Sequence, residues 1–268
     1  MKKIASFAVV FLLLRGVIFA QRSVMIEELT PSEVSAAIVD GKTTVFLYSG
    51  GVHESKYKAT APDPVALGKH NFVANYIARH VAEGLGNALA FVFPASPQGD
   101  PVKKTVHMMF AGTVTLSEDT YERAIRDICS SLKTAGFKNM VMAGDHGLGQ
   151  TAMKKVAADL DPQWSSEGVH VFFFPVYADA KKELKAYVTT QGVPAKLGDR
   201  DLHTELEDIT EVMFVDREGA WVRKDKIPPE VAKWATAATG KVFVEQKINI
   251  ALKYIRSQVG TAAASRNR

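Results

Sequence analysis

Short and long apolar segments alternate along this chain. Short runs rich in β-branched and aromatic residues predict strands, and longer segments with an apolar residue every three or four positions predict amphipathic helices. The predicted strands cover residues 43–48, 89–93, 137–143 and 169–176. The predicted helices cover residues 71–83, 117–135, about 151–160, about 179–189 and about 241–257. This alternation predicts an α/β fold: a three-layer α/β/α domain whose mainly parallel central sheet is covered on both faces.

The helix predicted over residues 117–135 has the clearest boundaries. Ser117 is a natural N-cap, and the two acidic residues that follow it favour the positive end of the helix dipole. The apolar residues then form one stripe, and Gly136 stands where a left-handed C-terminal cap belongs. Cys129 lies on this stripe, so we expect it to pack in the core. Because it is the only cysteine, the chain can form no intrachain disulfide and no cysteine-rich zinc site.

The first 20 residues resemble a secretory signal peptide. Two lysines precede an apolar run over residues 4–14, and Ala20 is a small residue before the expected cleavage point. An uncleaved anchor is the alternative, but this run is shorter than the roughly 20 apolar residues that span a membrane. We therefore expect an exported protein, periplasmic or secreted, in which residues 21–268 form a single domain. No later segment is apolar enough to predict a membrane span after signal removal.

The net charge says little about partners. The chain has 33 basic and 29 acidic residues, which gives a net charge of +4. Three of the basic residues lie in the first 20 positions, where there is no acid, so the rest of the chain carries 30 basic and 29 acidic residues. A body so close to neutral predicts no nucleic-acid partner.

Several common catalytic motifs are absent from the sequence. The chain has no G-x-S-x-G nucleophile elbow and no Walker A loop. His53 and Glu54 begin like the zinc motif H-E-x-x-H, but position 57 is a tyrosine. The glycines after residue 143 are spaced G-x-x-G-x-G, which differs from the G-x-G-x-x-G dinucleotide fingerprint. Lipase-type serine hydrolases, P-loop enzymes and helical zinc proteases are therefore excluded, and dinucleotide binding is disfavoured.

Histidines and acids gather in the loops between the predicted elements. The candidates for a common site are His53, Glu54, His70, Asp145, His146, His203 and Asp208. Ligand sites of parallel sheets lie beyond the carboxyl ends of the strands, where such loops are found. Imidazole and carboxylate ligands suit Zn, Mn or Fe. His146 is the most suggestive of these residues, because its small neighbours let a ligand approach the backbone.

Most of these positions also have a purely structural interpretation. Asp145 suits a cap of the following helix, and the acids at 205–208 suit a solvated helix start. Among the other histidines, we expect His80 on a helix surface, His170 in the core and His107 in a loop.

Taken together, these loops resemble the creatininase (creatinine amidohydrolase-like) family over about residues 44–257. Five segments carry the resemblance: GGVHE at 50–54, ALGKHN at 66–71, HMMFAGTVTL at 107–116, GDHGLGQ at 144–150 and HTELEDI at 203–209. The resemblance implies a creatininase-like three-layer α/β/α domain, often assembled as a hexamer. It also implies hydrolysis of a C–N bond in a small linear or cyclic amide by water activated at a divalent metal, Zn, Mn or Fe.

The resemblance assigns roles to individual residues by their position in the motifs. The implied metal ligands are Glu54, His70, His146 and Asp208, with His53 as the competing choice for Glu54. The implied catalytic residues are His203, for proton transfer or substrate orientation, and Asp145.

Two departures from the family pattern bear on function. Lys56 replaces a His or Asn of the first loop, and His70 replaces a bridging Asp. A neutral imidazole lacks the two oxygens of a bridging carboxylate, which favours a single metal ion. The departures leave an alternative open, a non-catalytic periplasmic ligand-binding protein with the same fold. A third hypothesis is phosphate or nucleotide binding by the glycine loop at a helix N-terminus.

Overall fold

A four-stranded parallel sheet forms the centre of the protein. The computed structural model describes residues 23–54, 64–104, 106–144, 146–193 and 206–266. Within them the strands are β1 (Thr44–Ser49), β2 (Ala88–Phe93), β3 (Asn139–Gly144) and β4 (His170–Phe173). Their order in the sheet is β2-β1-β3-β4, and every pair is parallel. The predicted α/β class with a parallel central sheet is confirmed.

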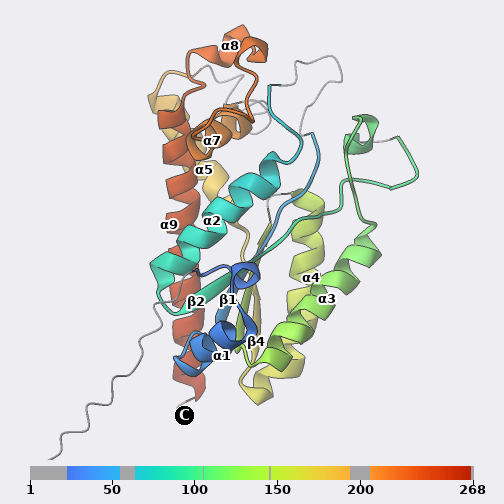
Figure 1. Ribbon diagram of the computed structural model, residues 1–268, viewed down its shortest axis with the longest axis vertical. Coiled ribbons are helices and arrows are strands. Elements are labelled where there is room, and N and C mark those ends of the chain that lie inside the picture. Colours follow the sequence, from blue (N-terminus) through green and yellow to red (C-terminus); the bar gives the residue numbers. More distant parts are fainter. Residues whose placement is uncertain (1–22, 55–63, 105, 145, 194–205, 267–268) are drawn as a thin grey trace, which may run out of the picture.

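Helices cover both faces of this sheet (Figure 1). One face carries α1 (Pro31–Val39), α3 (Glu118–Ala135) and α4 (Gly147–Trp164). The other carries α2 (Lys69–Leu85), α5 (Val176–Thr190), α7 (Asp208–Val215) and α9 (Ala237–Arg266). The shorter elements are α8 (Pro229–Ala232), η1 (Ile26–Glu28), η2 (Val106–Met109), η3 (Ser165–Glu167) and η5 (Lys224–Lys226).

The core divides into two halves at the sheet. In β1, Val45 and Leu47 pack with α3 and α4, whereas Phe46 and Tyr48 pack with the helices of the opposite face. All six residues of β1 are buried. This burial on both faces explains why the strand is an almost continuous apolar run in the sequence.

Helix α3 ends as its sequence predicts. The Ser117 side chain accepts a hydrogen bond from the Thr120 amide, and Gly136 closes the helix at φ +110°. Cys129 is fully buried, and burial raises the pKa of its thiol to about 12. Cys129 is thus a core residue, as expected.

Other boundaries differ from the predictions. Strand β4 stops at Phe173, whereas the apolar pattern runs to residue 176, because Pro175 has no amide to donate to a neighbouring strand and α5 begins directly after it. Helix α4 begins at Gly147, four residues earlier than expected. Helix α1 is not among the predicted helices, although Thr30 and Glu33 form a capping box at its start.

Two histidines of minor interest lie near their expected places. His170 is half-buried in β4, and its Nδ1 lies 3.2 Å from Asp161 Oδ1. His80 is only partly on the surface, because its ring stacks on Tyr76 at 4.0 Å and its Nδ1 lies 2.8 Å from the Tyr76 carbonyl oxygen. Among the described residues, no helix combines the length and the hydropathy that crossing a membrane requires.

Candidate functional site

The candidate residues gather beyond the carboxyl end of the sheet. The loop after β1 carries His53 and Glu54, the connection after β2 carries His107 in η2, and the loop after β3 carries His146. The chain passes from β1 to β2 on one side and then crosses back to β3 on the other side of β1, so the strand order reverses there. This reversal is where open parallel sheets place their ligand sites.

Four imidazole rings form a cluster at this position. The ring centroid of His53 lies 4.1 Å from that of His70, 5.4 Å from that of His107 and 5.0 Å from that of His146. The His107 and His146 centroids are 5.0 Å apart. The rings of His53 and His70 are stacked with an angle of 7° between their planes, whereas His107 and His146 are steeply inclined to His53.

Glycine at position 51 makes room for this cluster. A Cβ atom at Gly51 would lie 2.8 Å from His53 Nδ1 and 2.8 Å from Ser96 Oγ, closer than real Cβ contacts allow. The backbone of the first loop therefore passes close to the imidazole of His53. A larger residue would displace that ring.

Burial keeps the central imidazole neutral. His53 is 1% exposed, and within the described part of the chain neither of its ring nitrogens has a hydrogen-bond partner. Burial, followed by the charges that His70 and His146 would carry, holds the pKa of His53 far below its ordinary value. Burial also lowers the pKa of His107. Neutral imidazole is the form that binds metal ions.

The hydrogen bond of His107 determines which of its nitrogens can face a ligand. Its Nδ1 lies 2.6 Å from the carbonyl oxygen of Glu54. A carbonyl oxygen only accepts, so Nδ1 carries the proton and Nε2 carries the lone pair. Metal-binding histidines are commonly oriented in this way by a backbone carbonyl.

The spacing of three rings fits a metal ion. Zinc binds imidazole nitrogens at about 2.0–2.1 Å, so three rings around one tetrahedral ion have centroids about 5 Å apart. His53, His107 and His146 have this spacing. Among the described residues, however, no group of three or more His, Cys, Asp or Glu side chains is arranged to hold a metal ion as it stands. Three imidazole nitrogens are suitable ligands for a transition metal, but the rings of His53, His107 and His146 have to turn before they can bind one.

The two carboxylates predicted as metal ligands lie on either side of a lysine. Lys69 Nζ is 3.3 Å from Glu54 Oε1 and 3.5 Å from Asp208 Oδ2. Glu54 and Asp208 are each 5% exposed and Lys69 is 2% exposed. The interpretation of residues 205–208 as a solvated helix start is therefore wrong for the residues from 206 on, because α7 packs its first turn against α2 and α9.

A second buried lysine pairs with acids at the start of α7. Lys247 Nζ, from α9, is 2.7 Å from Glu207 Oε1 and 2.8 Å from Glu211 Oε1. It is 2% exposed, as Lys69 is. Two lysines, one from α2 and one from α9, thus neutralise acids of the same helix start, which is what carboxylates removed from water require.

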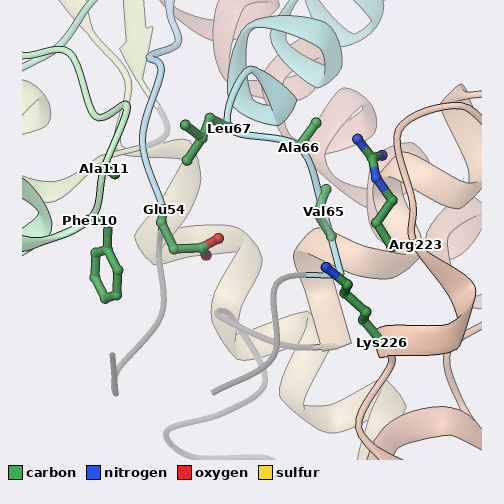
Figure 2. Close-up of a pocket in the computed structure, with 8 residues that line it drawn as sticks. All are labelled: Glu54, Val65, Ala66, Leu67, Phe110, Ala111, Arg223 and Lys226. Atoms are coloured by element: carbon green, nitrogen blue, oxygen red, sulfur yellow. The ribbon is translucent and has the colours of Figure 1, made fainter. Parts of the chain in front are cut away.

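A pocket of about 500 Å³ adjoins Glu54 (Figure 2). The Glu54 carboxylate points into it, and Arg223 and Lys226 stand on its opposite side. The remaining lining residues are Val65, Ala66, Leu67, Phe110 and Ala111. The pocket thus combines an apolar wall with an acid at one end and two cations at the other, and its volume suits a small molecule.

The structure brings together the four predicted metal ligands, but in two groups. His70 and His146 belong to the imidazole cluster, and Glu54 and Asp208 flank Lys69. Asp145 and His203, the predicted catalytic residues, lie outside the described residues, so their roles stay predictions.

His53 and His107 are the cluster members that the predicted ligand set lacks. Two features of the sequence pointed to them. His107 lies in the segment at 107–116 that resembles the family, and His53 was the alternative to Glu54 as a metal ligand. Lys69 and Lys247 carried no signal, since an isolated lysine usually lies at the surface.

The comparisons with known proteins agree with this fold. A family model described as creatininase (creatinine amidohydrolase) matches residues 27–247. Solved structures of creatinine amidohydrolase and of a Mn form of creatininase each have a TM-score of 0.69 and 17% identity, and cover 88% of this chain and 98% and 99% of theirs. A creatininase variant described as Zn–Zn type has a TM-score of 0.69, 17% identity, and covers 88% of this chain and 98% of its own.

At 17% sequence identity the solved structures establish the fold alone, and the match to the family model establishes membership of the family. A search of curated protein sequences gives no significant match. The family model spans most of the chain, including the loops that carry His53, His70, His107 and His146. The chain therefore belongs to the creatininase family.

Proposed function

We propose that this protein is a metal-dependent amidohydrolase that cleaves the C–N bond of a small linear or cyclic amide. The observation that carries the proposal is the cluster of four imidazoles at the reversal point of the sheet, next to Glu54, which lines a pocket of about 500 Å³. Family membership supports the reaction class, and relatives described as Mn and Zn–Zn forms support a divalent ion.

The histidines are the residues that would hold the ion. His53, His107 and His146 have the spacing of a three-imidazole set, and His70 lies directly against His53. A divalent ion supplies Lewis-acid polarisation of an amide carbonyl and a lower pKa for bound water. The stacked rings of His53 and His70 cannot both direct a nitrogen in plane at one ion, so one of them turns or stays outside the ligand set.

Glu54 is the described acid best placed for proton transfer. Its carboxylate points into the pocket, and Lys69 Nζ lies 3.3 Å from its Oε1. We assign it the transfer of a proton from the attacking water to the leaving nitrogen. This role replaces direct metal binding for Glu54, because its carboxylate is already paired with an ammonium group.

The pocket itself favours a substrate with an anionic group. Arg223 and Lys226 line the cavity from η5 and the residue before it, on the side opposite Glu54. An amide that carries a carboxylate can place this group on the two cations and its reacting bond toward Glu54. The apolar wall of Val65 and Leu67 then excludes water along one side.

Metal analysis followed by an amide panel tests the proposed function. The full-length protein is loaded with Zn²⁺, Mn²⁺ or Fe²⁺, freed of excess metal, and analysed for bound metal per chain. Linear and cyclic amides, with and without a carboxylate, are then offered to the loaded protein. Stoichiometric metal with turnover of at least one amide is expected. A protein that binds no metal under any loading contradicts the proposal.

A non-catalytic ligand-binding protein is the alternative that one observation favours. Lys69 already neutralises Glu54 and Asp208, and no ready metal site is found among the described side chains. Thermal-shift screening of the same amides separates the two functions. Stabilisation by an amide without metal and without turnover would favour the binding protein.

We also propose that the protein is exported and, by family resemblance, a homo-oligomer. The basic residues and apolar run of the first 20 positions support export. N-terminal sequencing of the protein recovered from its host is expected to begin at Gln21. Light scattering of the same material determines the oligomeric state, for which the family suggests a hexamer.

A further inference from the structure

Lys69 occupies a position between two carboxylates that would otherwise suit a metal ion. Its Nζ lies 3.3 Å from Glu54 Oε1 and 3.5 Å from Asp208 Oδ2, and 3.5 Å from the carbonyl oxygen of His53. Three oxygens, two from the loop after β1 and one from the start of α7, thus surround one ammonium group. Carboxylate and carbonyl oxygens are also the ligands that divalent cations take from proteins.

Burial makes this positive charge a requirement. Glu54, Lys69 and Asp208 are all at least 95% buried, at exposures of 5%, 2% and 5%. Two carboxylates that close together and so far from water need a cation, because the charged form is otherwise too costly. Lys69 supplies a cationic group from within the chain, so no dissolved ion has to bind there.

The local structure fixes the ammonium in place. Lys69 is the first residue of α2, and the next residue, His70, enters the imidazole cluster. Asp208 is the first residue of α7, and Lys69, His70, Asp208 and Glu211 line one narrow gap between these helices. The packing of α2 against α7 therefore keeps Lys69 next to Glu54 and Asp208.

We infer that Lys69 supplies the cation of the Glu54–Asp208 pair, so that this centre takes one divalent ion and not two. The inference rests on the proposed metal-dependent function. The one exchangeable ion binds at the imidazole cluster, and the carboxylate pair takes no metal ion because Lys69 already places a positive charge between the two acids. Lys69 thereby determines how many divalent ions each chain binds.

A count of bound metal ions in charge variants tests the inference. Full-length wild type, Lys69→Met and Lys69→Arg are saturated with Zn²⁺, freed of excess metal by gel filtration, and analysed by elemental mass spectrometry against protein concentration. Lys69→Met keeps most of the aliphatic stem, removes the charge and vacates the position of Nζ. We expect one ion per chain in wild type and in Lys69→Arg, and two in Lys69→Met.

Lys247→Met is the matched control. Lys247 is equally buried and also lies between two carboxylates, Glu207 and Glu211, but it does not contact Glu54 or Asp208 in any described interaction. We expect one ion per chain in this variant. A second ion in Lys247→Met as well would show that any buried acid pair that loses its lysine collects zinc, and would overturn a specific role for Lys69.

The remaining outcomes separate the inference from the function on which it rests. No bound ion in wild type after loading with Zn²⁺, Mn²⁺ or Fe²⁺ overturns both. Two ions in wild type, or one ion in folded Lys69→Met, overturns the inference and leaves the amidohydrolase proposal standing. If Lys69→Met does not fold, the same count is made on Lys69→Ala refolded with Zn²⁺, with the same expectation of two ions. The wild-type count needs no variant and can by itself contradict the inference.

Discussion

The rings of His53 and His70 lie parallel and 4.1 Å apart, although one belongs to the loop after β1 and the other to the first turn of α2. Burial, followed by the nearby His70, holds the pKa of His53 far below its ordinary value, so the stack contains a neutral His53. The stack therefore ties the protonation of the site to the packing of α2 against the sheet.

Replacement of His146 is expected to remove the metal. His146→Ala deletes one of three rings that have the spacing of a common ligand set. We expect metal affinity to fall by more than about 100-fold, beyond the 10–100-fold that the loss of an outer partner of a ligand costs. Titration with Zn²⁺ against a chelating dye measures the affinity. His80→Ala, outside the cluster, is the control, and equal affinities in both variants would place the metal elsewhere.

The metal-free protein is expected to lose stability in mild acid. The pKa of His53 and the pKa of His107 are both lowered in the folded chain, chiefly by burial, so the unfolded chain binds protons that the folded chain does not. The free energy of unfolding is therefore unaffected by protonation of these two histidines above pH about 6.5, the ordinary pKa of histidine. It decreases as the pH falls below that value. For His53, the free energy of unfolding decreases by up to about 1.4 kcal/mol per pH unit.

Urea unfolding between pH 8 and pH 5.5 measures this loss. Wild type and His53→Asn are compared in the presence of a chelator, and the dependence of unfolding free energy on pH is expected to be flatter in the variant. Identical slopes in both proteins would show that His53 does not carry the effect.

Lys247 is expected to be essential for the stability of α7. Lys247→Met leaves Glu207 and Glu211 buried without their ammonium partner, and removal of one member of such a pair costs about 3–5 kcal/mol. Lys241→Met on the same helix α9 is the control, because Lys241 is 57% exposed and pairs with Glu245 at the surface. Its cost is expected to be below about 1 kcal/mol. Urea unfolding at pH 7.5 measures both, and equal losses would contradict the difference in burial.

The two cations of the pocket are expected to act on substrate binding. Arg223→Ala or Lys226→Ala should raise KM for an amide with a carboxylate by up to about five-fold each, since an exposed ion pair contributes at most about 1 kcal/mol. We expect kcat to change little, because these groups stand away from Glu54. Lys224→Ala, in the same short helix but outside the pocket lining, is the control. Equal effects on a neutral amide would argue against recognition of an anion.

Local sequence patterns determined most of the secondary structure. The buried strands are apolar because parallel strands are covered on both faces, and Ser117 and Gly136 bound α3 because capping needs only neighbouring residues. The motif segments were also sufficient to identify the family and to predict that His70 and His146 lie at the carboxyl end of the sheet. These features depend on short stretches of chain, which is why they can be predicted without the tertiary structure.

Tertiary packing decided the composition of the site. In the sequence His53 and Glu54 are adjacent alternatives, but the turn of the first loop directs His53 into the imidazole cluster and Glu54 toward Lys69 and the pocket. In the sequence Lys69 and Lys247 look like ordinary surface lysines, but the packing of α2, α7 and α9 buries both of them. Burial and the direction of a side chain arise from contacts between residues far apart in the chain, and the sequence of one segment does not contain them.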